Sequence, residues 1–317
     1  MLASIAPVMR YPGRVIDKLE FLIALARERH FGHAAEACGV TQPTLSAGIK
    51  QLEETLGVLL VQRGSRFHSF TPEGERVLDW ARRIVGDARA MRQEMKALTG
   101  GLTGHLKIAA VPTALAMVAT LTTPYRQRHP GVSFTVLSRT SVEILGLLEN
   151  LEIDAGVTYV DNEPIGRVQT VPLYREQYRL VTSADSALGD RGEVTWAEVG
   201  AIPLCLLTSD MQNRRIIDRY LRDAGCEPAP TLASDSMIVL FSHVRTGQWA
   251  TVMPAKLAEV LGLMETIRVI PIADPAQGHH PFPTVGLVVP HREPMTPLTA
   301  ALVAEARRMA DPLPEPR

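Results

Sequence analysis

Short polar side chains cluster between residues 41 and 50. The cluster consists of Thr41, Gln42, Pro43, Thr44, Ser46 and Lys50. A glutamine amide can pair with adenine through two hydrogen bonds, and hydroxyl groups can contact bases or phosphates. A lysine, together with the free amides of a helix N-terminus, can hold phosphate oxygens. The set therefore suits contact with DNA, and the alternative is the solvated polar face of an ordinary helix.

A second group of hydroxyl side chains follows apolar stretches in the C-terminal two thirds of the chain. Its members are Thr113, Ser138, Ser141, Thr208 and Ser209. Hydroxyls that follow a strand and open a helix form, with the free amides there, a site for an anion such as a carboxylate. The alternative is that these side chains only cap helices. The nearby Arg139 and Arg214 are expected at the surface.

The cysteines and histidines predict neither a disulfide framework nor a metal site. The three cysteines are widely spaced, form no CxxC pair and are odd in number, which favours buried or half-buried thiols. A redox pair of Cys205 and Cys226 is the weaker alternative. His279 and His280 have no third ligand at metal-binding spacing, so we expect no metal and no other cofactor.

Three helices are predicted to position the first polar group. Apolar residues recur at helical spacing over 17–29, and an Ala-rich segment over 33–38 ends before a glycine. Thr41 stands where the N-cap of the third helix belongs, with a proline tolerated in the first turn, and Gly57 ends that helix. Its expected buried stripe is Leu45, Ile49, Leu52 and Leu56. This order predicts a helix-turn-helix whose third helix lies in the major groove.

A basic hairpin and a long helix are predicted next. Residues 58–70 alternate apolar and basic side chains, and Arg63 and Arg66 suit a wing that touches the DNA backbone or minor groove. A Thr-Pro start opens a helix over 72–98. Its apolar face comprises Val77, Trp80, Ala81, Ile84, Ala88, Met91, Met95 and Leu98. So narrow a seam indicates a partner helix, most simply its own copy in a dimer.

Three glycines within residues 99–104 predict a domain boundary. Beyond it, predicted strands over 106–111, 133–137 and 155–159 alternate with helices, which indicates a mostly parallel sheet. Further strands and helices predict two α/β lobes joined by two crossing strands. Lobe 1 is expected over about 104–177 and 280–317, and lobe 2 over about 178–279.

The stretch over 30–78 resembles the N-terminus of LysR-type transcriptional regulators. The matching elements are Ala34-Ala35, Gln42-Pro43, Leu45-Ser46, Ile49, Leu52-Glu53, Leu56-Gly57, Arg63, Thr71 and Gly74. Later landmarks agree, namely the segments 151–154, 246–247 and 253–254. The resemblance covers about Asp17 to Ala310 and leaves the first 15 residues as an extension. It departs at Ala47 and Gly48, where the family usually has Arg and Gln, so the operator preference is expected to differ.

The resemblance implies the fold class and the partners. It implies a winged helix-turn-helix domain over 1–71, a linker helix over 72–99 and, over 104–317, a two-lobed effector domain similar to periplasmic solute-binding proteins. The partners are double-stranded promoter DNA, a small-molecule effector between the lobes, and further copies of the chain. A dimer through 72–98 assembles into a tetramer that bends DNA and alters promoter access for RNA polymerase. Thr113 and Ser141 match effector-contacting positions of the family.

Charge and composition agree with this expectation. Residues 1–98 hold 14 Lys or Arg and 11 Asp or Glu, whereas the remainder holds 19 and 23. A mildly basic front half permits contact with nucleic acid. No apolar run is long enough to span a membrane and no secretory signal is evident, so a cytoplasmic regulator is expected rather than a membrane protein.

Two other protein classes account less well for the sequence. A solute-binding protein for a transporter accounts for residues 104–317 but requires a secretory signal and leaves the first 98 residues without a role. An enzyme fused to a DNA-binding domain requires a catalytic motif. The sequence contains no GxSxG, P-loop, HExxH or strand-linked GxGxxG, so we expect no enzymatic activity.

Overall fold

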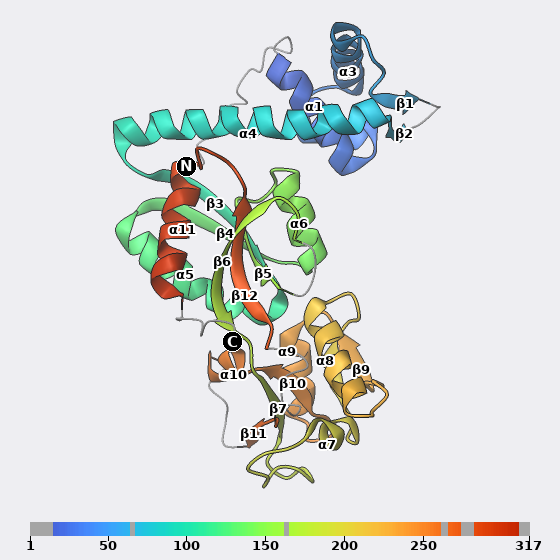
Figure 1. The fold of residues 1–317 in the computed structure, drawn as a ribbon, viewed down its shortest axis with the longest axis vertical. Helices are drawn as coiled ribbons and strands as arrows, with labels where there is room; N and C mark the ends of the chain where they lie inside the picture. Colours follow the sequence, from blue (N-terminus) through green and yellow to red (C-terminus); the bar gives the residue numbers. More distant parts are fainter. Residues whose placement is uncertain (1–14, 64–66, 162–164, 261–265, 274–281, 311–317) are drawn as a thin grey trace, which may run out of the picture. The chain divides into compact units, whose positions relative to one another are not determined.

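The computed structural model describes residues 15–63, 67–161, 165–260, 266–273 and 282–310 (Figure 1). The chain divides into two compact units. Residues 1–95 belong to the first unit, with which residues 149–151 are grouped, and the rest of the chain forms the second.

The N-terminal unit is a three-helix assembly with a hairpin. Its elements are α1 (Val15–Glu28), α2 (Phe31–Cys38), α3 (Gln42–Leu56), β1 (Val61–Arg63), β2 (Phe67–Phe70) and the start of α4 (Pro72–Gly100). The predicted ends of α3 are confirmed: the Thr41 hydroxyl accepts a hydrogen bond from the Thr44 amide, and Gly57 adopts the left-handed conformation that ends the helix. Leu56, expected in the buried stripe, is instead exposed.

A buried carboxylate attaches the hairpin to α3. Glu53 is 5 % exposed, and its Oε1 accepts hydrogen bonds from the backbone amides of Leu60 and Val61 at 2.9 and 3.2 Å. The Thr71 hydroxyl donates to the Leu59 carbonyl at 2.6 Å and accepts from the Gly74 amide at 2.9 Å. These bonds fix the start of β1 against α3 and the start of α4 against the hairpin.

The long helix α4 divides its apolar residues between two faces. Leu78, Ala81 and Val85 are buried in the core of the N-terminal unit. A second set, the α4 stripe, remains exposed and consists of Trp80, Ile84, Met91, Met95 and Leu98. Ala81 was predicted to share the face of the α4 stripe, but it faces the core. The helix also extends to Gly100, past the predicted end at residue 98.

Lobe 1 of the C-terminal unit is built on a five-stranded sheet of order β4-β3-β5-β12-β6. The strands are β3 (Thr103–Ala110), β4 (Gly131–Ser138), β5 (Ala155–Tyr159), β6 (Val168–Arg175) and β12 (Thr284–Pro290). β3 runs parallel to β4 and β5, whereas β12 runs antiparallel to β5 and β6, so the sheet is mixed rather than mostly parallel. Helices α5 (Leu115–Arg128) and α11 (Pro297–Met309) lie on one side of it and α6 (Ser141–Glu149) on the other (Figure 1).

Lobe 2 is built on two small sheets. β7 (Tyr178–Ser183) lies between β10 (Thr251–Pro254) and β11 (Ile267–Pro271), with antiparallel pairing on both sides, and β8 (Cys205–Leu207) pairs parallel with β9 (Leu232–Ser234). The helices are α7 (Trp196–Gly200), α8 (Gln212–Asp223), α9 (Met237–Val244) and α10 (Ala255–Val260). Sequence analysis missed β6, β9, β11 and α10. The chain passes from lobe 1 to lobe 2 at residues 176–177 and returns between β11 and β12.

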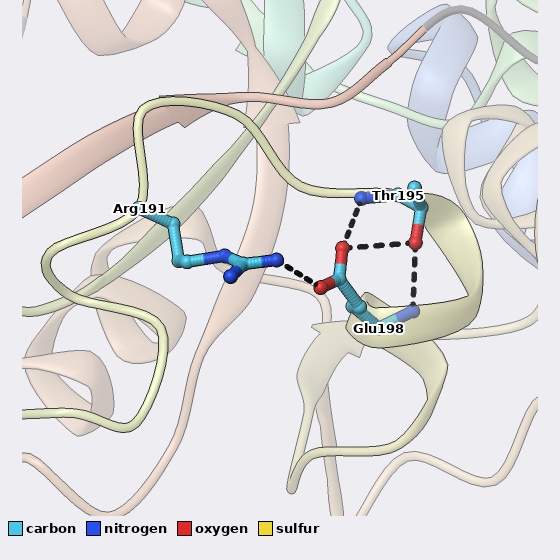
Figure 2. A network of polar contacts seen from close by, with 3 residues as sticks. All are labelled: Arg191, Thr195 and Glu198. Carbon is cyan, nitrogen blue, oxygen red and sulfur yellow. Dashed lines mark hydrogen bonds and ion pairs between the residues drawn. The ribbon is translucent and has the colours of Figure 1, made fainter.

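The start of the short helix α7 is held by side chains (Figure 2). Thr195 is the N-cap of α7, and its hydroxyl accepts from the Glu198 amide at 3.2 Å while Glu198 Oε2 accepts from the Thr195 amide at 2.8 Å. Arg191 donates to the other carboxylate oxygen at 2.6 Å. Backbone and side-chain hydrogen bonds from Thr195 hold the pKa of Glu198 below its usual value. This capping box defines the helix start.

Candidate functional site

The first polar group lies at the N-terminal end of α3, on the surface. Thr41, Gln42, Pro43 and Lys50 are exposed, and Thr44 and Ser46 are half-buried. The hydroxyls of Thr41 and Thr44 share a hydrogen bond of 2.9 Å. Because Thr41 caps the helix, the end of α3 that carries Gln42 is ordered by its own sequence and presents polar groups outward.

Ala47 and Gly48, which depart from the LysR pattern, occupy different environments. Ala47 is exposed on the same end of α3. Gly48 is buried against α1, and a β-carbon there would lie 2.7 Å from Cδ2 of Phe21. Gly48 therefore permits close packing of the Phe21 ring, and the structural reason for this glycine is helix packing rather than an altered surface.

The hairpin positions one of the two predicted wing arginines. The backbone of Arg63 ends β1, which pairs antiparallel with β2. Arg66 lies outside the described residues. The wing is thus present as a hairpin, and the contacts of its arginines remain a prediction.

Thr113 lies in a buried hydroxyl cluster and does not cap a helix. It belongs to a short 3-10 turn, η1 (Pro112–Ala114), and its hydroxyl lies 3.3 Å from the Tyr159 hydroxyl at the end of β5. Tyr159 donates its single proton to Glu176 and also accepts from Asn213 Nδ2 at 3.2 Å. Because that proton is already used, Thr113 must be the donor to Tyr159.

Ser141 is the first residue of α6, but it is not the helix cap. Thr140 caps α6 through a reciprocal pair with Glu143: the Thr140 amide donates to the carboxylate at 2.8 Å, and the Glu143 amide donates to the Thr140 hydroxyl at 3.2 Å. The Ser141 side chain is 3 % exposed, and among the described residues its Oγ has no hydrogen-bond partner. The capping alternative is therefore wrong for Ser141, and a buried hydroxyl remains to be satisfied.

Buried polar atoms without a hydrogen-bond partner among the described residues also occur at the start of α8. Thr208 follows β8, and its Oγ1 is a buried atom with no hydrogen-bond partner among the described residues. Gln212, the first residue of α8, is 3 % exposed and its Nε2 is likewise unsatisfied. Met211 is the N-cap and makes no side-chain cap hydrogen bond. The first turn of α8 thus has no side-chain cap, and an amide and a hydroxyl without partners belong to it and to the segment before it, where an anion is favoured.

Three other predicted positions differ from this pattern. Ser138 and Ser209 are exposed. Arg214, expected at the surface, is 8 % exposed and donates to Asp218 at 2.7 Å and to the Leu207 carbonyl at 2.9 Å. Burial of this arginine is compatible with the fold because its charge is paired within α8 and bound to the end of β8. Arg139 is exposed, as expected.

Sequence analysis missed a buried carboxylate beside Thr113. Glu176, 1 % exposed, lies where the chain passes from lobe 1 to lobe 2, and its Oε2 accepts from Tyr159 and, at 3.0 Å, from Tyr178. Burial raises the pKa of Glu176 to about 7, although both tyrosine hydroxyls and the Asn213 amide act to lower it. The sequence signal that could have indicated this residue is an acidic side chain between two strands, β6 and β7, that each contain a tyrosine.

The two cysteines of lobe 2 are free thiols in different environments. Cys205 is buried in β8, and burial raises the pKa of its thiol to about 11. Cys226 is a half-buried thiol whose Sγ lies 3.7 Å from the Ala197 carbonyl. Within the described ranges no group of three His, Cys, Asp or Glu side chains is placed to hold a metal, and His279 and His280 lie outside those ranges. In the same ranges no helix has the length and apolar character to cross a membrane.

Two family models match the chain, and together they cover most of it. Residues 16–75 match the bacterial regulatory helix-turn-helix protein of the lysR family, and residues 99–311 match the LysR substrate binding domain. The DNA-binding transcriptional dual regulator OxyR of Escherichia coli K12 is 27 % identical over 274 residues, which cover 86 % of this chain and 88 % of that protein. A probable hydrogen peroxide-inducible genes activator of Streptomyces viridosporus is 30 % identical, covering 83 % and 85 %.

Solved structures show the same architecture. A full-length OxyR variant from Pseudomonas aeruginosa superposes with a TM-score of 0.71 at 25 % identity, covering 92 % of this chain and 97 % of that one. CbnR, a LysR family regulator solved with its target DNA, shares the fold with a TM-score of 0.57 at 21 % identity, covering 93 % and 99 %. The chain belongs to the LysR family and is a DNA-binding transcriptional regulator with an effector-binding domain.

Proposed function

We propose that the regulator recognises its operator through the N-terminal end of α3 and responds to a small anionic effector held near Ser141, Thr208 and the start of α8. The observation that carries the effector assignment is that buried hydroxyl and amide atoms of these residues have no hydrogen-bond partner in the described part of the chain. Each such atom costs about 1–3 kcal/mol when it is buried without a partner, so a ligand that satisfies several of them gains that much from each.

The chemistry of these atoms favours a carboxylate. Gln212 Nε2 is a donor, the hydroxyls of Ser141 and Thr208 can donate, and the first-turn amides of α8 only donate. The α8 N-terminus adds the favourable end of a helix dipole. Thr113 belongs to the proposal as a residue that orders Tyr159 beside α8, whereas the exposure of Ser138 and Ser209 makes them comparison positions.

The exposed face of α3 supports the operator assignment. Gln42 and Lys50 are exposed. In this proposal Gln42 reads bases together with Thr41, Thr44 and Ser46, and Lys50 holds a phosphate. Arg63 and Arg66 extend the basic surface along the wing in this proposal. Ala47 offers no hydrogen bond, so base recognition falls mainly to Gln42.

Self-association through the α4 stripe is part of the proposal. Trp80 and Leu98 are 61 and 75 % exposed, and the stripe recurs at spacings of three, four and seven residues. This spacing is that of a helix–helix seam. Pairing of two chains along α4 would give two recognition helices for a palindromic operator, and further pairing gives the proposed tetramer.

Relatives named as peroxide-inducible activators raise oxidation as a second signal. Thiol oxidation requires a thiolate, since the thiolate is the nucleophile. The burial of Cys205 and the raised pKa of its thiol disfavour that chemistry in β8. A reversibly bound anion therefore has the stronger support.

Fluorescence anisotropy with labelled DNA from upstream of the gene tests both assignments. We expect salt-dependent binding that exceeds binding to random DNA, is weakened by Gln42→Ala, and changes when a carboxylate is added. Ser141→Ala and Thr208→Ala should abolish the response to the carboxylate while leaving DNA affinity intact. Ser209→Ala, an exposed neighbour, is the matched control.

Two results would contradict the proposal separately. Equal affinity for random and upstream DNA would refute operator recognition by α3. A response to hydrogen peroxide that is lost in Cys205→Ser, with no response to any carboxylate, would replace the anionic effector with an oxidation signal.

A further inference from the structure

Glu176 is a buried carboxylate whose two oxygens differ in their hydrogen bonds. Oε2 accepts hydrogen bonds from the hydroxyls of Tyr159 and Tyr178. Oε1 is buried and, within the part of the chain that the structure describes, hydrogen-bonds nothing. A carboxylate has about four acceptor sites, so half of this group is unsatisfied.

Among the described residues, no cation is found to act on the charge of this carboxylate. The groups that act on its charge are the hydroxyls of Tyr159 and Tyr178, the amide of Asn213 and the carboxylate of Asp161, and the last of these is repulsive. A buried acid without a cationic partner is costly and is retained at ligand sites more readily than in plain cores.

Glu176 is linked to the proposed effector residues through one hydroxyl. Tyr159 donates to Glu176, accepts from Thr113 and accepts from Asn213, the second residue of α8. Gln212, with its unsatisfied amide, is the residue before Asn213. The Tyr159 hydroxyl therefore joins the second residue of α8 to the carboxylate that carries Oε1.

We propose that Glu176 determines effector specificity, with its Oε1 accepting a hydrogen bond from an ammonium or hydroxyl group on the effector. The effector is then a small carboxylic acid that also carries such a donor, that is, an amino acid or a hydroxy acid. This inference rests on the proposed function, because the acid group of the effector is assigned to the α8 end of the same site.

The physical basis is the asymmetry of buried hydrogen bonding. An acid that lacks a donor leaves Oε1 unsatisfied and sets its own charge beside Glu176, whereas a donor-bearing acid satisfies Oε1. A hydrogen bond to a charged group contributes enough to separate the two classes by roughly 10- to 100-fold in affinity. An ammonium also offsets the negative charge and should outrank a hydroxyl.

Matched ligand sets on the full chain test the inference. Each set contains a parent acid, its hydroxy acid and its amino acid: propionate, lactate and alanine; succinate, malate and aspartate; 3-phenylpropionate, phenyllactate and phenylalanine. In whichever set binds, isothermal titration calorimetry should give the hydroxy acid and the amino acid an affinity roughly 10-fold or more above that of the parent acid. In Glu176→Gln that preference should collapse, while the parent acid binds as well as it does to wild type or better.

The controls separate the possible failures. Gln177→Ala, an exposed change in the same segment, should leave the ranking unchanged. Circular dichroism melts of Glu176→Gln establish that the variant is folded. If no acid of any set binds to wild type, the proposed anionic effector is wrong. If acids bind but the parent equals its donor-bearing partners, and Glu176→Gln changes nothing, only the role of Glu176 is refuted, and Oε1 is then satisfied by water.

Discussion

Replacement of Glu176 by Gln should stabilise the effector domain at alkaline pH. In the folded chain burial raises the pKa of Glu176 from 4.5 to about 7. A carboxyl group whose pKa is raised by folding contributes most below its unfolded pKa, and that contribution is lost as the pH rises through the folded pKa. The wild type should therefore lose stability between about pH 4.5 and 7, whereas a glutamine at this position cannot ionise.

The size of the effect follows from the two pKa values. The full gap corresponds to about 3 kcal/mol at alkaline pH, and about 1 kcal/mol of it is already present at pH 5.5. The stability of Glu176→Gln relative to wild type should thus grow by about 2 kcal/mol between pH 5.5 and 8 and change little above. When the two proteins are compared at the same pH, the contributions of all other titrating groups to the free energy of unfolding cancel.

Hydrogen exchange followed by mass spectrometry is the suitable assay, since peptides from β6 and β7 report on the segment that holds Glu176. Tyr178→Phe provides a second, independent signature. It removes a donor that favours the ionised carboxylate and so raises the folded pKa of Glu176 further, and the loss of stability, which still begins near the unfolded pKa, should continue to higher pH. A difference between Glu176→Gln and wild type that is constant from pH 5.5 to 8 would refute the reasoning.

Three further predictions concern the N-terminal unit. Gly48→Gln should lower the free energy of unfolding by about 1 kcal/mol in urea melts, because crowding of Phe21 outweighs the gain in helix propensity; equal or greater stability would show that the site has room. Gln42→Ala should reduce operator affinity without changing affinity for random DNA, whereas Lys50→Ala should weaken both and lower the salt slope by about one; equal losses for both variants on both DNAs would contradict separate roles. Met91→Glu should shift the chain to a smaller species in analytical ultracentrifugation, and an unchanged sedimentation profile would exclude α4 pairing.

The sequence specified the N-terminal unit most completely because its signals are local. Thr41 caps α3 and Gly57 ends it, as their residue types predict. The environment of Gly48 could not be foreseen, because the contact that requires glycine comes from Phe21, 27 residues earlier in the chain. Likewise Ala81 was predicted to share a face with Trp80, and only the packed structure shows that it faces the core together with Leu78.

In the effector-binding domain, spacing located the hydroxyls but not their partners. Ser141 was expected to cap α6, yet Thr140 takes that role because Glu143 stands three residues later and completes a capping box. Gln212 and Glu176 were missed because neither lies in a recognisable motif. Each carries one buried atom, Glu176 Oε1 or Gln212 Nε2, that has no hydrogen-bond partner among the described residues. That burial depends on how β5, β6, β7 and α8 meet in space, which the sequence pattern does not show.

In the proposed function, the chemistry at the start of α8 differs from that of an oxidation sensor on the same scaffold. Gln212 and Thr208 present an amide and a hydroxyl, which exchange hydrogen bonds but form no covalent bond with an oxidant. The nearest thiol in β8, Cys205, is buried and held neutral by its raised pKa. A response built on such groups follows the free concentration of the effector and reverses when the effector is diluted. It requires no reductant to reset, since nothing is oxidised.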